Sequence, residues 1–410
     1  MHIKCTNGTP KLDSLDHLPP LPLFIDYRHT RRGVTLTEQD ELGIYHVLRL
    51  QDRVRHIELN LPPSILHKVV VLMDEQFPIL EHLSLTSSAT SNSLPLTLPK
   101  AFLAPNLRFL TLRSINPPRR LWSLISTVSL VTLKLSKIQT SSYFHPRLLV
   151  ARLRSLPQLK ELSIGFSTPI PRPSTERELL REQRTPATLP SLKILRFTGV
   201  GAYLESLVAH IRVPLLEHLH ITIFNQITIA LPHLSYLINT TEALNLPSVT
   251  VDFDCSGVYI TTVHRDSEWS VWGPFLLRVV CKQLDWQISC AAQICHALIP
   301  ALPCVEQLTL NSYQEIPTEL QDGAIDSTTW HDLLRSFIGV QSLRVYDRLS
   351  EELSRALQVD EVGSDPGFLP NLDSIHAADN VFTAFIDIRQ VVSRPVRFVK
   401  LESQSWHGLQ

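Results

Sequence analysis

Two histidines that lie two residues apart are the first candidates for chemistry in this sequence. His218 and His220 lie in a segment that alternates apolar and polar residues. On a strand, residues two apart point to the same side, so both imidazoles could face a metal ion or a partner. The neighbouring sequence offers no third or fourth ligand. Surface histidines between core leucines are therefore the simpler interpretation, and no metal site is expected.

A cysteine-rich segment raises a second alternative, a zinc site formed by Cys290, Cys295 and Cys304 with His296. Their spacing matches no standard zinc ligand set. Cys295 also lies in an apolar helical pattern over residues 291–299, which favours a buried thiol. A catalytic cysteine–histidine pair that uses His296 is excluded, because adjacent residues of a helix point in different directions.

Acid–base chemistry has no specific support either. Glu81-His82 and Glu217-His218 occupy the same position in two copies of one repeated phrase, so repeat similarity explains them better than a catalytic dyad. The sequence contains no Gly-x-Gly-x-x-Gly, no P-loop and no Gly-x-Ser-x-Gly motif. We therefore expect a protein that is not an enzyme and has no catalytic residue and no cofactor. A hydrolase built on the histidines is the alternative from the enzyme class.

The phrase that contains these histidines recurs along almost the whole chain and reads apolar-x-x-apolar-x-apolar. Leu80-Glu-His-Leu83-Ser-Leu85 and Leu159-Lys-Glu-Leu162-Ser-Ile164 are clear copies. The last apolar residues of the copies, which we call the markers, are Leu59, Leu85, Leu112, Leu135, Ile164, Phe197, Ile221, Val251, Leu310, Val345, Ala377 and Leu401. Their spacing is close to the leucine-rich-repeat period of roughly 20–29 residues, with some longer units. Each copy is predicted to be one strand, and neighbouring units must stack to bury their apolar faces.

Prolines and helical patterns fill the segments between the phrases. A proline stands two residues before seven of them, at Pro78, Pro105, Pro157, Pro190, Pro214, Pro303 and Pro370. Proline ends a return helix and favours an extended chain before it. Apolar residues at helical spacing predict helices over 64–77, 144–156, 202–211, 291–299, 330–337 and 382–392.

The predicted fold class is α/β, an irregular leucine-rich-repeat solenoid with parallel strands on the concave face and helical returns on the convex face. Residues 1–36 are predicted to be an extended or disordered leader, 37–405 the solenoid and 406–410 a tail. A helix with Thr37 as its N-cap opens the solenoid. Irregular insertions are expected at about 169–188 and 256–275.

The middle of the chain is expected to be irregular. An extra strand is predicted over 258–263. A degenerate repeat around Leu284, Trp286 and Ile288 is expected to fill the wide gap between Val251 and Leu310. Trp269, Trp272 and Trp286 are expected to pack a widened core there.

Side chains that flank the inward leucines should project from the concave sheet and could contact a partner. Those chosen as candidate partner contacts are His82, Arg113, Lys134, Glu161, Arg196, His218, His220, Gln307 and Arg344. They are mixed in charge and short to medium in length, which suits recognition of a particular protein surface. A solvated sheet face is the alternative. Arg119 and Arg120 with Arg113 and Lys134 could form a local basic patch, but acidic residues elsewhere balance it and a solvated face is expected there.

Composition narrows the partners and the compartment. The formal net charge is −1 and the pI is about 7.0, which argues against nucleic acid or an acidic membrane as the partner. No signal peptide and no long apolar run are visible. The six cysteines include no Cys-x-x-Cys pair. We expect a cytoplasmic or nuclear protein with buried free thiols.

Several segments resemble the repeat region of fungal F-box/leucine-rich-repeat proteins, in particular the expanded families of mushroom-forming basidiomycetes. The resembling segments are Pro22-Leu-Phe-Ile-Asp-Tyr-Arg28, Arg53-Val-Arg-His-Ile57, Leu98-Pro-Lys-Ala-Phe-Leu-Ala-Pro-Asn-Leu107, Leu284-Asp-Trp-Gln-Ile288 and Thr329-Trp-His-Asp-Leu-Leu-Arg335. The resemblance implies a non-enzymatic substrate receptor of a cullin-type ubiquitin ligase, which holds a protein substrate on its concave face.

In that family a helical F-box upstream of the repeats binds a Skp-family adaptor. Here only Leu18-Pro-Pro-Leu-Pro22 stands upstream, so the F-box is expected to be lost or to lie beyond an incomplete start. Adaptor binding is expected only if an F-box exists upstream. The alternative is a stand-alone leucine-rich-repeat scaffold with no link to a ubiquitin ligase.

Overall fold

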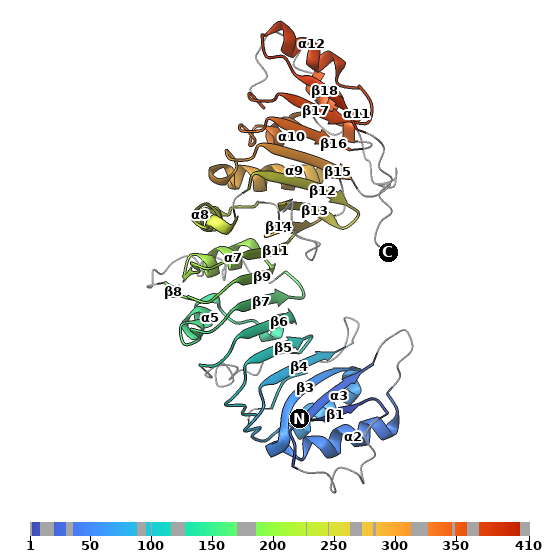
Figure 1. The fold of residues 1–410 in the computed structure, drawn as a ribbon, viewed down its shortest axis with the longest axis vertical. Coiled ribbons are helices and arrows are strands. Elements are labelled where there is room, and N and C mark those ends of the chain that lie inside the picture. Colours follow the sequence, from blue (N-terminus) through green and yellow to red (C-terminus); the bar gives the residue numbers. More distant parts are fainter. Residues whose placement is uncertain are drawn as a thin grey trace. The chain divides into compact units, whose positions relative to one another are not determined.

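The computed structural model of the chain consists of two compact units of mixed α/β structure (Figure 1). Unit 1 comprises Met1–Gly199 with Ala209–Leu216, and unit 2 comprises Val200–Val208 with Glu217–Gln410. The residues that the structure describes are 2–8, 20–29, 36–87, 96–99, 101–115, 128–169, 186–226, 228–244, 246–262, 273–281, 284–312, 327–346, 349–358 and 369–401.

Unit 1 contains a parallel sheet with strand order β1-β2-β3-β4-β5-β6-β7-β9. The strands are β1 (Ile3–Thr6), β2 (Leu23–Arg28), β3 (Val54–Leu61), β4 (His82–Ser87), β5 (Phe109–Arg113), β6 (Thr132–Ile138), β7 (Glu161–Phe166) and β9 (Ile194–Gly199). The helical segments are α2 (Glu38–Leu48), η1 (Gln51–Arg53), α3 (Pro63–Leu72), η2 (Thr140–Ser142) and α5 (Pro146–Leu153). The short strands β8 (Ala187–Thr188) and β10 (Ile211–Arg212) form a separate parallel pair.

The predicted strand phase is confirmed in unit 1. The markers are direct neighbours on adjacent strands, from Leu59 on β3 through Leu85, Leu112, Leu135 and Ile164 to Phe197 on β9. Each is at most 2% exposed. Side chains alternate between the two faces of a strand, so this row and its neighbours two residues away form the core. The N-cap prediction is also confirmed, because the Thr37 hydroxyl accepts a hydrogen bond from the Asp40 backbone N–H.

The sheet begins earlier than the sequence predicts. Strands β1 and β2 lie within residues 1–36, where a leader was expected, and they pair in parallel with each other and with β3. Leu23, Ile25 and Tyr27 are buried and alternate with residues that are half-buried or exposed. This plain period-two pattern is a strand signal, although it lacks the spacing of the repeated phrase. Residues 9–19 and 30–35 of the expected leader lie outside the described part of the chain.

Unit 2 contains a mixed sheet with strand order β11-β14-β13-β12-β15-β16-β17-β18. The strands are β11 (His218–Phe224), β12 (Ser248–Asp254), β13 (Gly257–Thr262), β14 (Phe275–Val280), β15 (Gln307–Ser312), β16 (Ser342–Val345), β17 (Ser374–Ala377) and β18 (Arg397–Lys400). The helical segments are α7 (Gly201–Val208), α8 (Pro232–Thr240), η3 (Glu242–Leu244), α9 (Leu284–Ala297), η4 (Ile299–Ala301), α10 (Ser327–Leu334), α11 (Leu349–Gln358) and α12 (Thr383–Val391).

For the middle of the chain, the predicted extra strand is confirmed and the predicted degenerate repeat is wrong. The extra strand is β13, which is antiparallel to both β12 and β14. The expected degenerate repeat at residues 284–288 is not a strand but the first turns of α9. Leu284 and Ile288 are four residues apart and both buried, which is helical spacing, whereas Trp286 between them is exposed. Strand β12 pairs directly with β15, so the units of Val251 and Leu310 are neighbours in the sheet, and β14 lies on the other side of β12, between β11 and β13.

The last strand of unit 2 is out of phase with its prediction. Strand β18 is shifted by one residue from its predicted marker, because Lys400 and not Leu401 pairs with Ala377. Little of β18 is buried, so no apolar face fixes its phase in the sequence.

Several predictions fall on residues outside the described part of the chain. These residues are Trp269, Trp272, Arg119, Arg120, 406–410 and most of the insertion at 169–188.

All six predicted helices are present as α3, α5, α7, α9, α10 and α12, although most are shorter than predicted and α9 begins earlier. Helix α8 was not predicted, and a residue of another helix caps it. Its own N-cap, Leu231, has no side chain that could do so. Instead, the buried Glu205 carboxylate of α7 accepts hydrogen bonds from the backbone N–H groups of His233 (2.8 Å) and Leu234 (3.0 Å). Residue 205 thereby joins two successive returns of unit 2.

We expect Glu205→Ala to lower the free energy of unfolding by about 1–3 kcal/mol, because it leaves two helix N–H groups without their acceptor. Chemical denaturation of the purified protein measures this difference. Glu242→Ala, at an exposed position of η3, is the matched control and should change stability by less than about 0.5 kcal/mol. Equal effects of the two substitutions would contradict the capping role.

Candidate functional site: the open face of the sheet

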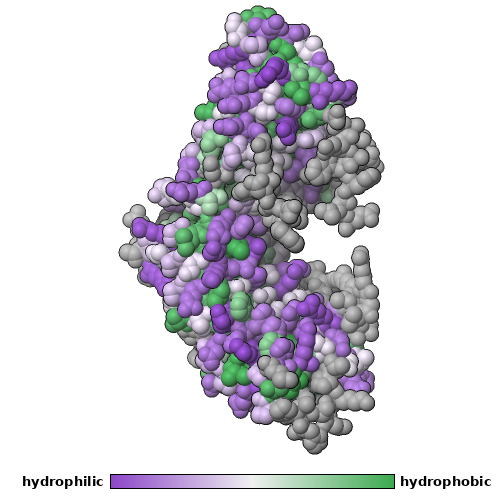
Figure 2. Space-filling model, viewed as in Figure 1, coloured by the Kyte–Doolittle hydropathy of each residue, from purple (hydrophilic) through white to green (hydrophobic). Residues whose placement is uncertain are grey.

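The residues that alternate with the buried markers form what we call the open face of each sheet. All nine candidate partner contacts lie on strands at such positions. His82 lies on β4, Arg113 on β5, Lys134 on β6, Glu161 on β7, Arg196 on β9, His218 and His220 on β11, Gln307 on β15 and Arg344 on β16. Each is half-buried or exposed, while the apolar residues of the phrase beside it are buried. In the view of Figure 2, hydrophilic residues predominate and hydrophobic ones are scattered between them.

Three of these residues form an ion-pair cluster on unit 1. Glu161 contacts Lys134 of β6 at 2.8 Å and also Arg196 of β9. Its side chain is only 15% exposed, while those of Lys134 and Arg196 are 37% and 40% exposed. Exposed ion pairs contribute about 0–1 kcal/mol to stability, so the fold does not depend on this cluster. It presents two partly exposed cations around one carboxylate, an arrangement that can recognise a partner surface of mixed charge.

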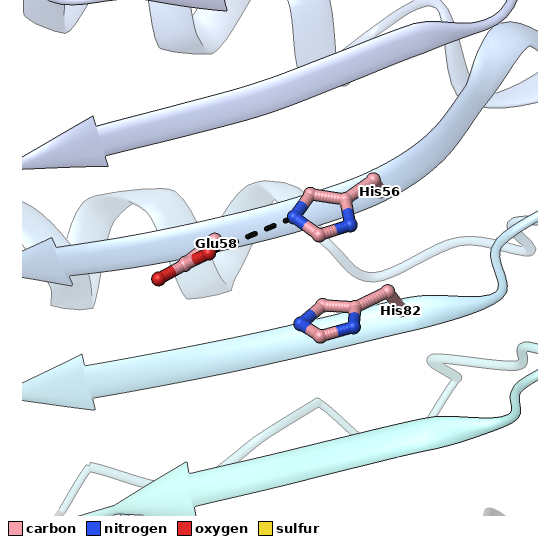
Figure 3. Close-up of side chains that lie close together, drawn as sticks. All are labelled: His56, Glu58 and His82. Carbon is pink, nitrogen blue, oxygen red and sulfur yellow. Dashed lines mark ion pairs between the residues drawn. The ribbon is translucent and has the colours of Figure 1, made fainter. Parts of the chain in front are cut away.

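A second feature is a row of rings across the first strands of unit 1. Phe24, His56, His82 and Phe109 are direct partners on β2, β3, β4 and β5. The ring centroids of His56 and His82 are 4.1 Å apart with 18° between the ring planes. Phe24 stacks on the other side of His56 at 5.3 Å, and Phe109 lies 5.6 Å from His82. Figure 3 shows the two imidazoles one above the other on neighbouring strands.

Burial favours the neutral form of both imidazoles. Burial lowers the pKa of His82 to about 4, and the positive charge of Lys134, and that of His56 when it is protonated, act in the same direction. Burial also lowers the pKa of His56, although the Glu58 carboxylate opposes that shift. Neutral rings stack without charge repulsion, and each keeps one nitrogen with a free lone pair.

Acidic and basic side chains flank this row on the same face. Arg28 contacts Asp26 at 2.9 Å and Glu58 at 3.0 Å, and Lys4 contacts Asp26 at 3.2 Å. The other oxygen of Glu58 lies 3.8 Å from Nε2 of His56. Among the described residues, His56, Glu58 and His82 are the group whose ligand atoms lie close enough together to hold a metal ion.

Sequence reasoning missed His56 and Glu58, although a signal was present. Val54-Arg-His-Ile57 has the same form as Leu80-Glu-His-Leu83, so two successive repeats carry histidine at the same phrase position. Parallel pairing of equal phrase positions places these two histidines opposite each other. In contrast, the His218 and His220 rings lie 6.2 Å apart at 73°, and His220 Nε2 lies 3.3 Å from the Gly273 carbonyl oxygen.

The open face of unit 2 has a different character. Strand β12 is buried on both faces, including Thr250 and Asp252. The Arg278 guanidinium lies 4.9 Å from the centre of the Tyr259 ring and donates a 2.6 Å hydrogen bond to the Ser256 hydroxyl. These contacts tie β13 to β14. The outward side chains in this region are therefore mostly engaged within unit 2.

The cysteines behave only partly as expected. Cys5, Cys281, Cys290 and Cys295 are buried free thiols, but Cys255 and Cys304 are exposed, contrary to the prediction. Both lie just outside a regular element, where no core face covers them. Burial raises the pKa of Cys295 well above its usual range, so this thiol is a poor nucleophile.

Comparison with known proteins gives no family. The sequence matches no protein-family model and no curated protein. Among solved structures it is similar to one described as "Crystal structure of TLR13-ssRNA13 complex", at 13% sequence identity and a TM-score of 0.35. The match covers 94% of this chain and 48% of that chain, so this chain spans about half the length of the other. No argument about fold or ligand rests on a likeness at this level. Within the described part of the chain, no helix is long and apolar enough to cross a membrane.

Proposed function

We infer that this protein is a non-enzymatic leucine-rich-repeat solenoid that binds a protein partner on the open face of its sheet. The observation that carries this inference is the cluster of Lys134, Glu161 and Arg196 on three neighbouring strands of unit 1. Strands β3, β4, β5 and β6 pair in strict register and present the same open face. A rigid parallel sheet holds such side chains at fixed spacing, which favours specific recognition of a partner.

The chemistry of this face suits a folded protein better than a polyanion. Carboxylates accompany the cations throughout unit 1, at Asp26, Glu58 and Glu161. A nucleic-acid site would instead need an excess of positive charge along the face. Complementary charges on a partner would fix its orientation and speed its association.

The resemblance to fungal F-box proteins supports a more specific role. In that role the open face holds a substrate for a cullin-type ubiquitin ligase in the cytoplasm or nucleus. A Skp-family adaptor would bind through an F-box upstream of the repeats. A stand-alone repeat scaffold uses the same face without the adaptor, and the two roles differ in whether the adaptor co-purifies.

Reversal of the central charge is the direct test of the face. Glu161→Arg places three cations together and is expected to weaken binding of the native partner at least tenfold. The partner is first identified by cross-linking in cells to a photoreactive residue placed at position 134, and affinity is then measured with purified components. Glu75→Lys reverses a charge at an exposed position after α3 and should leave affinity unchanged. Equal binding by wild type and Glu161→Arg would reject the open face as the site.

The ligase role has its own test. The protein expressed from its full natural transcript is expected to co-purify with a Skp-family adaptor and to promote ubiquitination of the cross-linked partner. Glu161→Arg should abolish ubiquitination while adaptor binding persists. Retention of the partner without any adaptor would instead support the stand-alone scaffold.

A further inference from the structure

The stacked histidines on unit 1 have a feature that packing alone does not require. His56 and His82 present ring nitrogens beside a carboxylate, and the ligand atoms of His56, Glu58 and His82 lie within 4.8 Å of one another. Figure 3 shows Glu58 further along the strand of His56, with a dashed line that joins one of its oxygens to that ring. We propose that His56, Glu58 and His82 bind a divalent transition-metal ion of the zinc type.

The ligand types define the class of ion. Two neutral imidazoles and one carboxylate are a ligand set that zinc uses where a coordination position stays open for water or another ligand. Imidazole nitrogen favours zinc, copper and nickel over magnesium or calcium, which prefer all-oxygen sites.

The geometry needs only a small adjustment to hold the ion. Ligand atoms about 2.1 Å from a tetrahedral zinc ion lie about 3.4 Å from each other. The three ligand atoms lie within 4.8 Å of one another, so side-chain rotation must draw them inward by up to about 1.4 Å and tilt the two stacked rings toward the ion. The strands need not move, because direct pairing of His56 with His82 fixes the two backbones.

Surrounding side chains pack against the two imidazoles and pair with the carboxylate. Phe24 and Phe109 lie on the outer sides of the two imidazoles and hold the ring stack. Arg28 binds one oxygen of Glu58 at 3.0 Å and leaves the other, Oε2, next to His56. Such outer partners typically change metal affinity by about 10- to 100-fold. The nearby cations Lys4 and Lys134 are each paired with a carboxylate, which limits their repulsion of the ion.

The proposal does not depend on the partner-binding role, because metal binding by the isolated protein is measured directly. Isothermal titration of the metal-free protein with zinc chloride gives the stoichiometry and the Kd. Cobalt(II) absorption then shows whether the ligands are nitrogen and oxygen or include a thiolate. The exposed thiols Cys255 and Cys304 are first replaced by serine, so that they do not compete for the ion.

His56→Phe and His82→Phe are the decisive variants, since phenylalanine already occupies this row and keeps the ring stack without the nitrogens. Each should weaken zinc binding by more than about 100-fold, beyond the effect of losing an outer partner. Glu58→Gln should weaken it at least about tenfold and preserves the shape of the side chain. The double variant His218→Phe/His220→Phe is the matched control and should bind like the parent protein.

The expected result is one ion per chain, with cobalt spectra free of thiolate bands. No stoichiometric binding by the parent protein would overturn the proposal. Unchanged affinity in His56→Phe and His82→Phe would overturn it as well, and so would loss of binding in the His218→Phe/His220→Phe control. Circular dichroism of each metal-free variant checks that it is folded. If one phenylalanine variant fails to fold, the other and Glu58→Gln still decide the question.

Discussion

Replacement of Trp330 by alanine is expected to lower the free energy of unfolding of unit 2 by about 3–5 kcal/mol. Trp330 lies on α10 and is 1% exposed. Its ring meets that of Phe253 on β12 edge to face, with centroids 6.1 Å apart. The substitution removes a large apolar surface from the core and leaves a cavity between α10 and the sheet, and the aromatic contact is lost in addition.

Trp286 provides a control of the same residue type on the neighbouring helix α9. It is 54% exposed, so Trp286→Ala should change the free energy of unfolding by less than about 1 kcal/mol. Urea denaturation followed by circular dichroism, which does not rely on tryptophan fluorescence, compares the two variants. A cost for Trp286→Ala as large as that for Trp330→Ala would mean that the packing of α9 and α10 described here is wrong.

This pair of residues also illustrates what sequence alone could not decide. Trp286 was expected to pack the core in a degenerate strand with Leu284 and Ile288, because residues two apart on a strand point to the same side. The same three residues also fit a helix in which 284 and 288 face inward and 286 faces outward. A short apolar run satisfies both periods, so only the longer context decides between them. Ala291, Ala292 and Cys295 continue the helical pattern and are buried.

The repeated phrase was predictable because burial imposes it. Leu110 on β5 and Leu133 on β6 pair directly, and a shift of one residue would expose both. The reversal of β13 is different. Nothing in the phrase specifies strand direction, which depends on how short the connection is. The tight turn at Cys255 and Ser256 between β12 and β13 is too short for a parallel crossover, which needs a dozen or more residues.

The sequence predicted the position of each candidate residue on its strand, but not the contacts between the candidate residues. Positions such as Lys134 and Glu161 follow from the alternation along each strand, and the structure places them on the open face. Their contacts depend on which strands are neighbours and in what register. His56 and His82 are separated by 25 intervening residues and meet only because their strands pair in phase. A comparison of equal phrase positions across repeats would have found this pair, whereas a search for closely spaced ligands could not.

The stability of the protein is expected to fall as the pH rises through the titration of Asp252. This residue of β12 is 7% exposed. Burial raises the pKa of its carboxyl group to about 7, opposed by a hydrogen bond with Asn311 and assisted by the negative charge of Asp254. Among the described residues, its Oδ1 atom has no hydrogen-bond partner. Ionisation therefore places a poorly solvated charge inside the sheet.

The sign of the effect follows from proton binding. The pKa of an aspartate in an unfolded chain is about 3.9, so between about pH 4 and about pH 7 the folded protein holds a proton that the unfolded chain has lost. The free energy of unfolding must therefore fall as the pH rises across this interval. The difference between the two pKa values corresponds to at most about 4 kcal/mol, because each pKa unit is worth about 1.36 kcal/mol.

Asp252→Asn removes the ionisation but keeps the size and shape of the side chain. We expect this variant to be more stable than wild type by up to about 4 kcal/mol at pH 8 and nearly equal to it at pH 4. Denaturation in urea at a series of pH values measures the difference. Asp285→Asn, at an exposed position of α9, should follow the wild-type profile throughout. A destabilised Asp252→Asn variant at pH 8 would contradict the expected cost of ionising this buried carboxyl group.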